Sequence, residues 1–389
     1  MIFLFLILFF MSGVLFLFLK KDIFHPSVIS NFVFAAVVFG YILSSHIYVY
    51  SLHANTLFFI FSSVATFSVA AYSFDSLTQL IKFKREKNVC YFSIEKSNKK
   101  LAFVVLCLSF LYLILRLKGY SFGSSIIAYL NQIRAADVED TTRNPVSYLQ
   151  PFMLASFAMY VLSNSISVNR LSKLANILII AIFSFAILLN TGKQIVFMVI
   201  MSYFYIVGVK KAKHFVYLLL SVAGLFAVYM VLLRGLSGSV IYYLSMYLVS
   251  PLIAFQHFYF ENNTSYAISH ALWFFERIWA LFSGGIPESL HKEFVWVGLP
   301  TNVYTAFSDY YTVSPFLNFF MMIVHGAISG ILWNISRYNN VVKVFYSYFI
   351  YTFAFIFYHE SFMVNLSSWM QMIIAIFILN FLVKERVYK

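Results

Sequence analysis

Long apolar stretches, separated by short polar or basic connections, run through the whole chain. Of the 389 residues, 62% are hydrophobic and only 11% are Asp, Glu, Lys or Arg, whereas about 25% of an ordinary soluble domain is charged. An apolar stretch of about 20 residues is long enough to cross a membrane as a helix. The pattern therefore excludes a soluble globular protein and predicts an all-α polytopic membrane protein.

Eleven stretches have the length and composition of membrane-spanning helices. Two more apolar stretches, 240–260 and 267–283, would make thirteen, but Glu276 and Arg277 interrupt the second one. We therefore favour in-plane or re-entrant helices there, within a single integral membrane domain that covers residues 1–389. The predicted spans are residues 2–19, 28–50, 57–79, 101–117, 147–163, 174–190, 194–209, 215–233, 313–333, 344–358 and 364–383.

The basic residues predict the orientation, because Lys and Arg are enriched in short cytoplasmic loops. If the connection after the third span is cytoplasmic, most of the 27 Lys and Arg residues fall on that side. The N-terminus is then outside and the C-terminus inside. Two long connections, 118–146 and 234–312, lie outside, and apolar residues at helical spacing between Phe122 and Ile133 predict an interfacial helix in the first.

Charge and spacing argue against several other classes of protein. The formal net charge is +13, but the basic residues form short clusters rather than one continuous face, so nucleic-acid binding is not indicated. Cys90 and Cys107 have no CxxC spacing, and the nine histidines have no HxxxH or HExxH spacing. We therefore expect no disulfide framework, no metal and no cofactor.

Two features inside the predicted spans have a structural explanation and need no catalytic role. Gly326 and Gly330 form a GxxxG pair, which predicts close contact with another helix. Asp75 lies near the cytoplasmic end of the third span. We expect its carboxylate to cap that helix or to pair with a basic neighbour in a loop.

Basic residues on the predicted outer side are informative, because the positive-inside bias disfavours them there. Any one of them can simply extend its side chain to lipid headgroups. Together they indicate an anionic substrate such as a lipid pyrophosphate, because guanidinium groups bind phosphate oxygens bidentately and lysine adds a point charge. These residues are Arg134, Arg143, Lys193, Arg234 and Arg277.

The outer connection ends in a polar and aromatic segment, residues 300–311. Asn302, Tyr304 and Asp309 offer the hydrogen-bonding groups and ring faces that a sugar needs, although a plain helix N-terminus has similar composition. His359 and Glu360 occupy a short outer turn between the last two spans. These polar side chains could stabilise the turn by hydrogen bonds or take part in catalysis, and stabilisation of the turn is slightly favoured.

The segment PTNVYTAFSDYY at residues 300–311 resembles the segment before a late transmembrane helix in Wzy-type O-antigen polymerases. The sequences TGKQ at 191–194, LLRG at 232–235 and YLVSPLIAF at 247–255 also resemble that family. The resemblance implies a helical, metal-independent membrane glycosyltransferase of the bacterial inner membrane, with 118–146 and 234–312 as periplasmic loops. Its implied partners are undecaprenyl-pyrophosphate-linked oligosaccharide, membrane lipid and a possible chain-length regulator.

The implied reaction transfers a growing O-antigen glycan from undecaprenyl pyrophosphate to a sugar hydroxyl of an incoming lipid-linked unit. Arg234 would stabilise the leaving pyrophosphate, and Asp309 or His359 would assist the attacking hydroxyl. Asn302 and Tyr304 would position the sugar, the other outer cations would bind substrate, and Glu261 is a further outward carboxylate.

Two alternatives remain open at this point. A flippase for the same lipid-linked saccharide should carry charged residues at mid-membrane and have short loops. Here the ionisable residues cluster at span ends and one outer loop is long, which favours an enzyme. The span layout does not distinguish a polymerase from an O-antigen ligase, which would attach finished chains to lipid A core.

Overall fold

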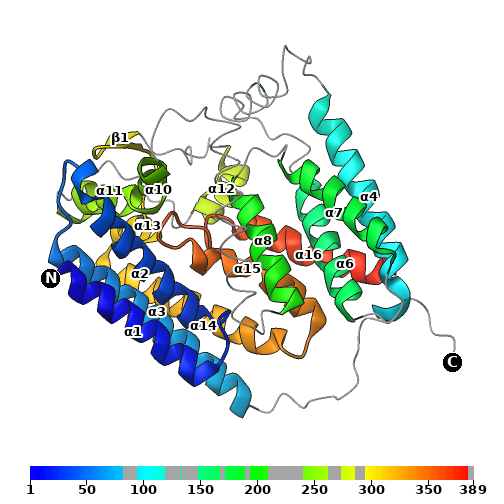
Figure 1. Ribbon diagram of the computed structural model, residues 1–389, viewed down its shortest axis with the longest axis horizontal. Helices are drawn as coiled ribbons and strands as arrows, with labels where there is room; N and C mark the ends of the chain where they lie inside the picture. Colours follow the sequence, from blue (N-terminus) through cyan, green and yellow to red (C-terminus); the bar gives the residue numbers. More distant parts are fainter. Residues whose placement is uncertain are drawn as a thin grey trace. The chain divides into compact units, whose positions relative to one another are not determined.

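The computed structural model describes residues 1–81, 94–118, 132, 148–166, 171–188, 193–208, 240–261, 273–284 and 294–383. Nearly all the regular structure in these ranges is helical (Figure 1). The chain divides into two compact units. The first comprises Met1–Arg85, Gly238–Ile335 and Phe349–Ser367, and the second comprises Glu86–Ser237, Ser336–Tyr348 and Ser368–Lys389.

Within these ranges, six helices are long and apolar enough to cross a membrane. Each of them coincides with a predicted span, which confirms the class of helical, multi-pass membrane protein. The helices are α1 (Ile2–Lys20), α2 (Pro26–Ser44, extended by the 3-10 turn η1, Ser45–Ile47), α3 (Ala54–Leu80), α4 (Ile94–Leu117), α14 (Pro315–Ser336) and α16 (Leu366–Val383).

Four shorter apolar helices lie at further predicted spans. They have 15 to 17 residues, which corresponds to about 22–26 Å of helix, slightly less than a membrane core of about 30 Å. The predicted span 215–233 and the predicted interfacial helix lie outside the described residues, so the count of eleven spans stays a prediction. The four helices are α6 (Gln150–Ile166), α7 (Lys173–Leu188), α8 (Lys193–Val207) and α15 (Asn340–Ala354).

The apolar stretch 240–260 is divided into three helical pieces. They are α10 (Val240–Leu248), α11 (Ser250–Phe255) and the π-helical turn η3 (Gln256–Glu261). Pro251 lies in the first turn of α11, where a missing N–H removes no helical hydrogen bond. The 11-residue helix α12 (Trp273–Ser283) is about 16 Å long, too short to cross a membrane. In-plane or re-entrant placement stays a prediction for both regions.

A small hairpin and a short helix connect this region to α14. Strands β1 (Val295–Trp296) and β2 (Pro300–Thr301) pair antiparallel, and α13 (Ala306–Tyr311) follows. The turn contains Gly298 at φ 101°, and a Cβ there would lie 2.2 Å from the carbonyl oxygen of Ile47. Only glycine fits both constraints, so the hairpin packs directly on the connection between α2 and α3.

The GxxxG pair lies against the backbone of α3. A Cβ added to Gly326 would lie 2.3 Å from the carbonyl oxygen of Phe67, and one added to Gly330 would lie 2.1 Å from that of Ala71. Side chains at these positions would force the two helices apart. The prediction that these glycines mediate close helix packing is confirmed.

Hydrogen bonds along the same interface show that α3 and α14 run in the same direction. Asn318, near the start of α14, donates to Ser63 Oγ at 2.8 Å, and Asn334, near its end, donates to the carbonyl oxygen of Asp75 at 2.9 Å. The predicted alternation of sides requires this parallel arrangement for the third and ninth spans. It follows that the start of α14, which α13 precedes, lies near the N-terminal half of α3.

The second unit is built on contacts of α4 with α6 and α7, and of α6 with α8. The rings of Phe157 and Phe183 stack at 3.8 Å. Polar contacts also join its helices: the Tyr348 hydroxyl donates to the carbonyl oxygen of Leu154 at 2.8 Å. The predicted site residue on a described helix of this unit is Lys193, the first residue of α8.

Candidate functional site

Among the described residues of the first unit, two clusters contain buried charged side chains, one before the start of α14 and one near its end. Because α14 has 22 residues, about 30 Å of helix separates the two clusters. We call the first the α13 cluster, and it consists of Tyr259, Tyr304, Asp309, Tyr310 and Glu360. The second, the Asp75 cluster, consists of Lys20, His25, Asp75, Ser76 and Gln79.

The α13 cluster forms where α13 meets the loop between α15 and α16. The backbone N–H of Ala306, at the start of α13, donates to the carbonyl oxygen of Ile356 in that loop at 3.0 Å. Four residues further on, the Tyr310 hydroxyl donates to Glu360 Oε1 at 2.7 Å. A backbone bond and a side-chain bond therefore attach the same short helix to the same loop.

The Glu360 carboxylate is only 3% exposed and is surrounded by donors. Besides the Tyr310 hydroxyl, it accepts the N–H groups of Phe362 at 2.8 Å, Met363 at 3.0 Å and Val364 at 2.7 Å. Burial raises the pKa of the Glu360 carboxyl, and these hydrogen bonds oppose that increase. The expectation that the polar side chains here stabilise the turn is confirmed for Glu360.

Tyr310 is suited to donate a proton in a hydrogen bond and is unsuited to act as a base. Burial raises the pKa of its hydroxyl well above the usual value, and the neighbouring charge of Glu360 adds to the effect. The phenol therefore keeps its proton. Sequence reasoning did not single out this residue beyond its place in the segment 300–311.

Asp309 and His359 lie directly next to the two residues that join α13 to the loop. Asp309 is 4% exposed and precedes Tyr310 on α13. His359 precedes Glu360, is half-buried, and lies beside the rings of Tyr351 and Tyr358. The two segments that carry the candidate bases are therefore in contact. The roles of the two residues stay predictions.

Tyr304 packs against an aromatic ring that the sequence analysis had not selected. The rings of Tyr259 and Tyr304 lie 4.9 Å apart at 78°, and both residues are buried. Burial raises the pKa of Tyr259, and the nearby Tyr304 and Asp309 add to that increase. Asn302 is half-buried in the connection between β2 and α13. The positioning of a sugar by Asn302 and Tyr304 stays a prediction.

The side chains of the predicted phosphate-binding cations are not described. Arg234, Arg134 and Arg143 lie outside the described residues. The remaining candidates lie on described elements but their side chains are not described: Lys193 begins α8, Arg277 lies on α12 and Glu261 ends η3. A shared site for a pyrophosphate therefore stays a prediction.

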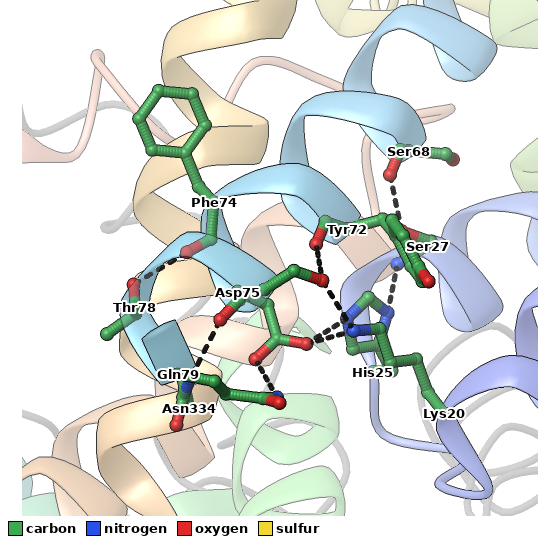
Figure 2. A network of polar contacts seen from close by, with 11 residues as sticks. Lys20, His25, Ser27, Ser68, Tyr72, Phe74, Asp75, Thr78, Gln79 and Asn334 are labelled. Atoms are coloured by element: carbon green, nitrogen blue, oxygen red, sulfur yellow. Dashed lines mark hydrogen bonds and ion pairs between the residues drawn. The ribbon is translucent and has the colours of Figure 1, made fainter. Parts of the chain in front are cut away.

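In the Asp75 cluster, residues of α1 and α3 and the N-cap residue of α2 surround a buried carboxylate (Figure 2). Lys20, the last residue of α1, forms an ion pair with Asp75 and donates to Ser76 Oγ at 3.3 Å. Gln79 donates to the other carboxylate oxygen at 2.9 Å, and His25 Nε2 lies 3.8 Å from the oxygen that Lys20 contacts. The prediction that Asp75 pairs with a basic residue is confirmed, but the partner is Lys20 at the end of α1 and not a residue of a loop.

Aromatic rings complete this second cluster. The Lys20 ammonium lies 4.0 Å from the centroid of the Tyr72 ring, and the Trp333 ring meets His25 edge-on at 4.7 Å. Cations over aromatic faces are stabilised further when they are desolvated. The charges in this cluster are paired within the protein, which suits a structural role, and the α13 cluster is the better candidate for chemistry.

Comparison with known proteins gives one full-length relative. The chain is 50% identical over 389 residues, covering all of both sequences, to an Escherichia coli (strain K12) protein named "Putative O-antigen polymerase". No family model matches the chain, and no solved structure matches it. The helices define a multi-pass membrane protein of the all-α class. At this identity over the full length, the chain belongs to the Wzy-type O-antigen polymerase family.

Proposed function

We propose that this chain polymerises oligosaccharide repeat units carried on undecaprenyl pyrophosphate at the periplasmic face of the bacterial inner membrane. The bond between the anomeric carbon of the growing glycan and its pyrophosphate oxygen breaks. A hydroxyl of the incoming lipid-linked unit forms the new glycosidic bond and loses its proton, and undecaprenyl pyrophosphate leaves. The full-length similarity to the Escherichia coli protein is the observation that carries this proposal.

The α13 cluster supports a role at the acceptor hydroxyl. Attack by a hydroxyl is helped by a base within hydrogen-bonding reach of its proton. Glu360 is occupied by four donors and Tyr310 retains its own proton, so neither suits this role. We assign proton acceptance to Asp309 or His359, and positioning of the acceptor sugar to Asn302 and Tyr304.

The leaving group would be stabilised by the basic residues of the outer connections. Pyrophosphate gains negative charge as the anomeric bond breaks, so fixed cations lower the barrier. Arg234 follows three apolar residues at the predicted hydrocarbon boundary, where a lower dielectric constant strengthens its electrostatic interaction with an anion. We assign it the main catalytic role, with Lys193, Arg277, Arg134 and Arg143 as further contacts to the lipid-linked substrate.

The placement of charge supports an enzyme over a flippase. In the described parts of the six candidate spans, acidic and basic side chains lie near helix ends, as Lys20 and Asp75 do. His325 lies in the middle of α14, where it is buried and hydrogen-bonded to Thr352 at 2.8 Å. A flippase is expected to line a mid-membrane cavity with charged groups.

Deletion of the gene in the source bacterium tests the proposal against both alternatives. Loss of a polymerase should leave a single capped repeat unit on lipid A core, and restoring the chain should restore the full saccharide ladder. A strain with no surface saccharide at all would point instead to a ligase or a flippase. The sodium dodecyl sulfate gel pattern of extracted lipopolysaccharide distinguishes these outcomes.

A further inference from the structure

We infer that Glu360 is a positioning residue for the acceptor site, holding the loop that carries His359 against the short helix that carries Asp309. This inference rests on the proposed polymerase function and deepens it. It assigns no proton transfer to Glu360. The carboxylate would act through Tyr310 and through the backbone that it binds, by fixing where the two candidate bases lie.

The first observation is the number of donors that one carboxylate holds. Oε1 accepts the Tyr310 hydroxyl and the N–H groups of Phe362 and Met363, and Oε2 accepts the N–H of Val364. An ionised carboxylate is an acceptor only, and its hydrogen bonds are stronger than neutral ones. The backbone N–H groups of three consecutive residues are thereby bound to the carboxylate of the residue that follows His359.

The second observation is that a ring contact and a hydrogen bond of His325 connect this loop to α14 and α15. The His325 ring lies parallel to the Phe362 ring, with 4.5 Å between centroids and an interplanar angle of 1°. The same histidine is hydrogen-bonded to Thr352 at the end of α15. The loop is therefore supported by α14 and α15, and Tyr310 connects its carboxylate to α13.

The third observation is that Glu360 has little room to serve as the base itself. A general base needs a lone pair that reaches the substrate hydroxyl, directly or through one water. The Glu360 side chain is almost fully buried, and its donors come from the protein. A position error of about 1 Å can lower a reaction rate by about 100-fold, so a residue that fixes the two neighbouring segments can control turnover without touching substrate.

The test uses a substitution that removes only the connection to α13. Tyr310→Phe keeps the ring and leaves the three backbone bonds of Glu360 in place. Tyr311→Phe is the matched control: it lies next along the same helix, and its ring packs on Phe59 at 5.1 Å and on Phe255 at 5.8 Å. The two full-length variants are reconstituted in liposomes of bacterial phospholipid and supplied with the cognate undecaprenyl-pyrophosphate-linked repeat unit.

We expect Tyr310→Phe to lower kcat by about 10- to 100-fold per folded molecule, from the sensitivity of rate to geometry. KM and the apparent pKa values of the pH profile should stay close to those of Tyr311→Phe. A purely structural role would reduce the amount of folded protein and leave the turnover of each folded molecule unchanged. Equal turnover in Tyr310→Phe and Tyr311→Phe would therefore overturn the inference.

Glu360→Gln provides a second, independent variant. Its amide places an N–H₂ group where one carboxylate oxygen now accepts a donor, so the loop must rearrange, and turnover should fall as it does in Tyr310→Phe. If Glu360 were instead the base, Glu360→Gln would abolish turnover while Tyr310→Phe retained it. Full turnover in Glu360→Gln would also refute positioning.

The outcomes separate this inference from the roles proposed above. If Asp309→Asn and His359→Ala both polymerise normally while Tyr310→Phe does not, the assigned bases are wrong. Glu360 then still positions the acceptor site through Tyr310, but the claim that it does so by placing those two bases is refuted. If the unaltered chain makes no polymer in the same liposomes, the proposed function fails and the inference fails with it.

Discussion

Replacing Lys20 by Met should destabilise the first unit by about 3–5 kcal/mol, because it leaves the buried Asp75 carboxylate without its main counter-ion. The Lys20 side chain is 9% exposed and that of Asp75 is 0% exposed, so water cannot take over the lost interaction. Gln79 and His25 still face the carboxylate. We therefore expect a loss of folding free energy at the lower end of this range.

The double variant Lys20→Met with Asp75→Asn should recover much of the loss, since replacing both members of a buried pair often costs little. Lys21→Met is the control: Lys21 is the exposed neighbour, and a surface substitution of this kind changes stability by about 0.5 kcal/mol or less. The assay is unfolding of the purified protein in mixed micelles of increasing sodium dodecyl sulfate content. Equal midpoints for Lys20→Met and Lys21→Met would refute the claim that the ion pair stabilises the fold.

Four further results are expected. Arg234→Ala should abolish long polymer at normal protein abundance, a loss of about 100- to 1000-fold in rate. Arg234→Lys should restore only part of the polymer, because lysine lacks the bidentate geometry of a guanidinium group. Full-length polymer from the alanine variant would rule out the assigned role. Asp309→Asn and His359→Ala, compared by lipopolysaccharide ladder at matched expression, should differ, with long chains lost in whichever variant removes the base. Gly330→Ala should lower the unfolding midpoint more than Gly13→Ala. The new methyl group would meet a backbone carbonyl oxygen at Gly330, whereas at Gly13 it would meet a Phe ring that can move. Similar midpoints would contradict the packing argument. A reporter fused at Lys87 should be active only as a cytoplasmic reporter, and a periplasmic signal there would reverse the proposed orientation.

The length and composition of the apolar stretches were sufficient to predict the long helices. The third predicted span, 57–79, corresponds to α3 at Ala54–Leu80, and the ninth, 313–333, corresponds to α14 at Pro315–Ser336. The start of α14 moves to Pro315 because proline is favoured in the first turn of a helix. Hydropathy identifies the residues that lie in the membrane but not the residues that cap a helix. Errors of a few residues at the predicted ends of the spans are therefore expected.

The sequence did not predict how the stretch 240–260 is divided. α10 and α11 are mostly apolar, and η3 mixes polar and aromatic residues, so hydropathy gives no sign of the π-helical turn at Gln256–Glu261. Gln256 shows what the stretch contributes: its amide donates to the carbonyl oxygen of Ser51 at 2.7 Å and accepts the N–H of His53 at 2.7 Å. These contacts join residues about 200 positions apart, and a local pattern cannot contain them.

The candidate site was predicted in its segments and not in its contacts. The composition of residues 300–311 and the pair His359–Glu360 were identified from the sequence. The hydrogen bond between Tyr310 and Glu360 spans 50 residues, and the pairing of Tyr259 with Tyr304 spans 45. Such contacts depend on how the helices pack, which hydrophobic pattern alone leaves open.

Reconstitution of the purified chain tests the central claim most directly. Liposomes that contain only this protein and a lipid-linked single repeat unit should accumulate a ladder of lipid-linked glycans, with one undecaprenyl pyrophosphate released for each bond formed. Lengthened glycan and released carrier would have to appear together, and both should be lost with Arg234→Ala. Liposomes that move the lipid-linked unit across the bilayer but form no glycosidic bond would contradict the account.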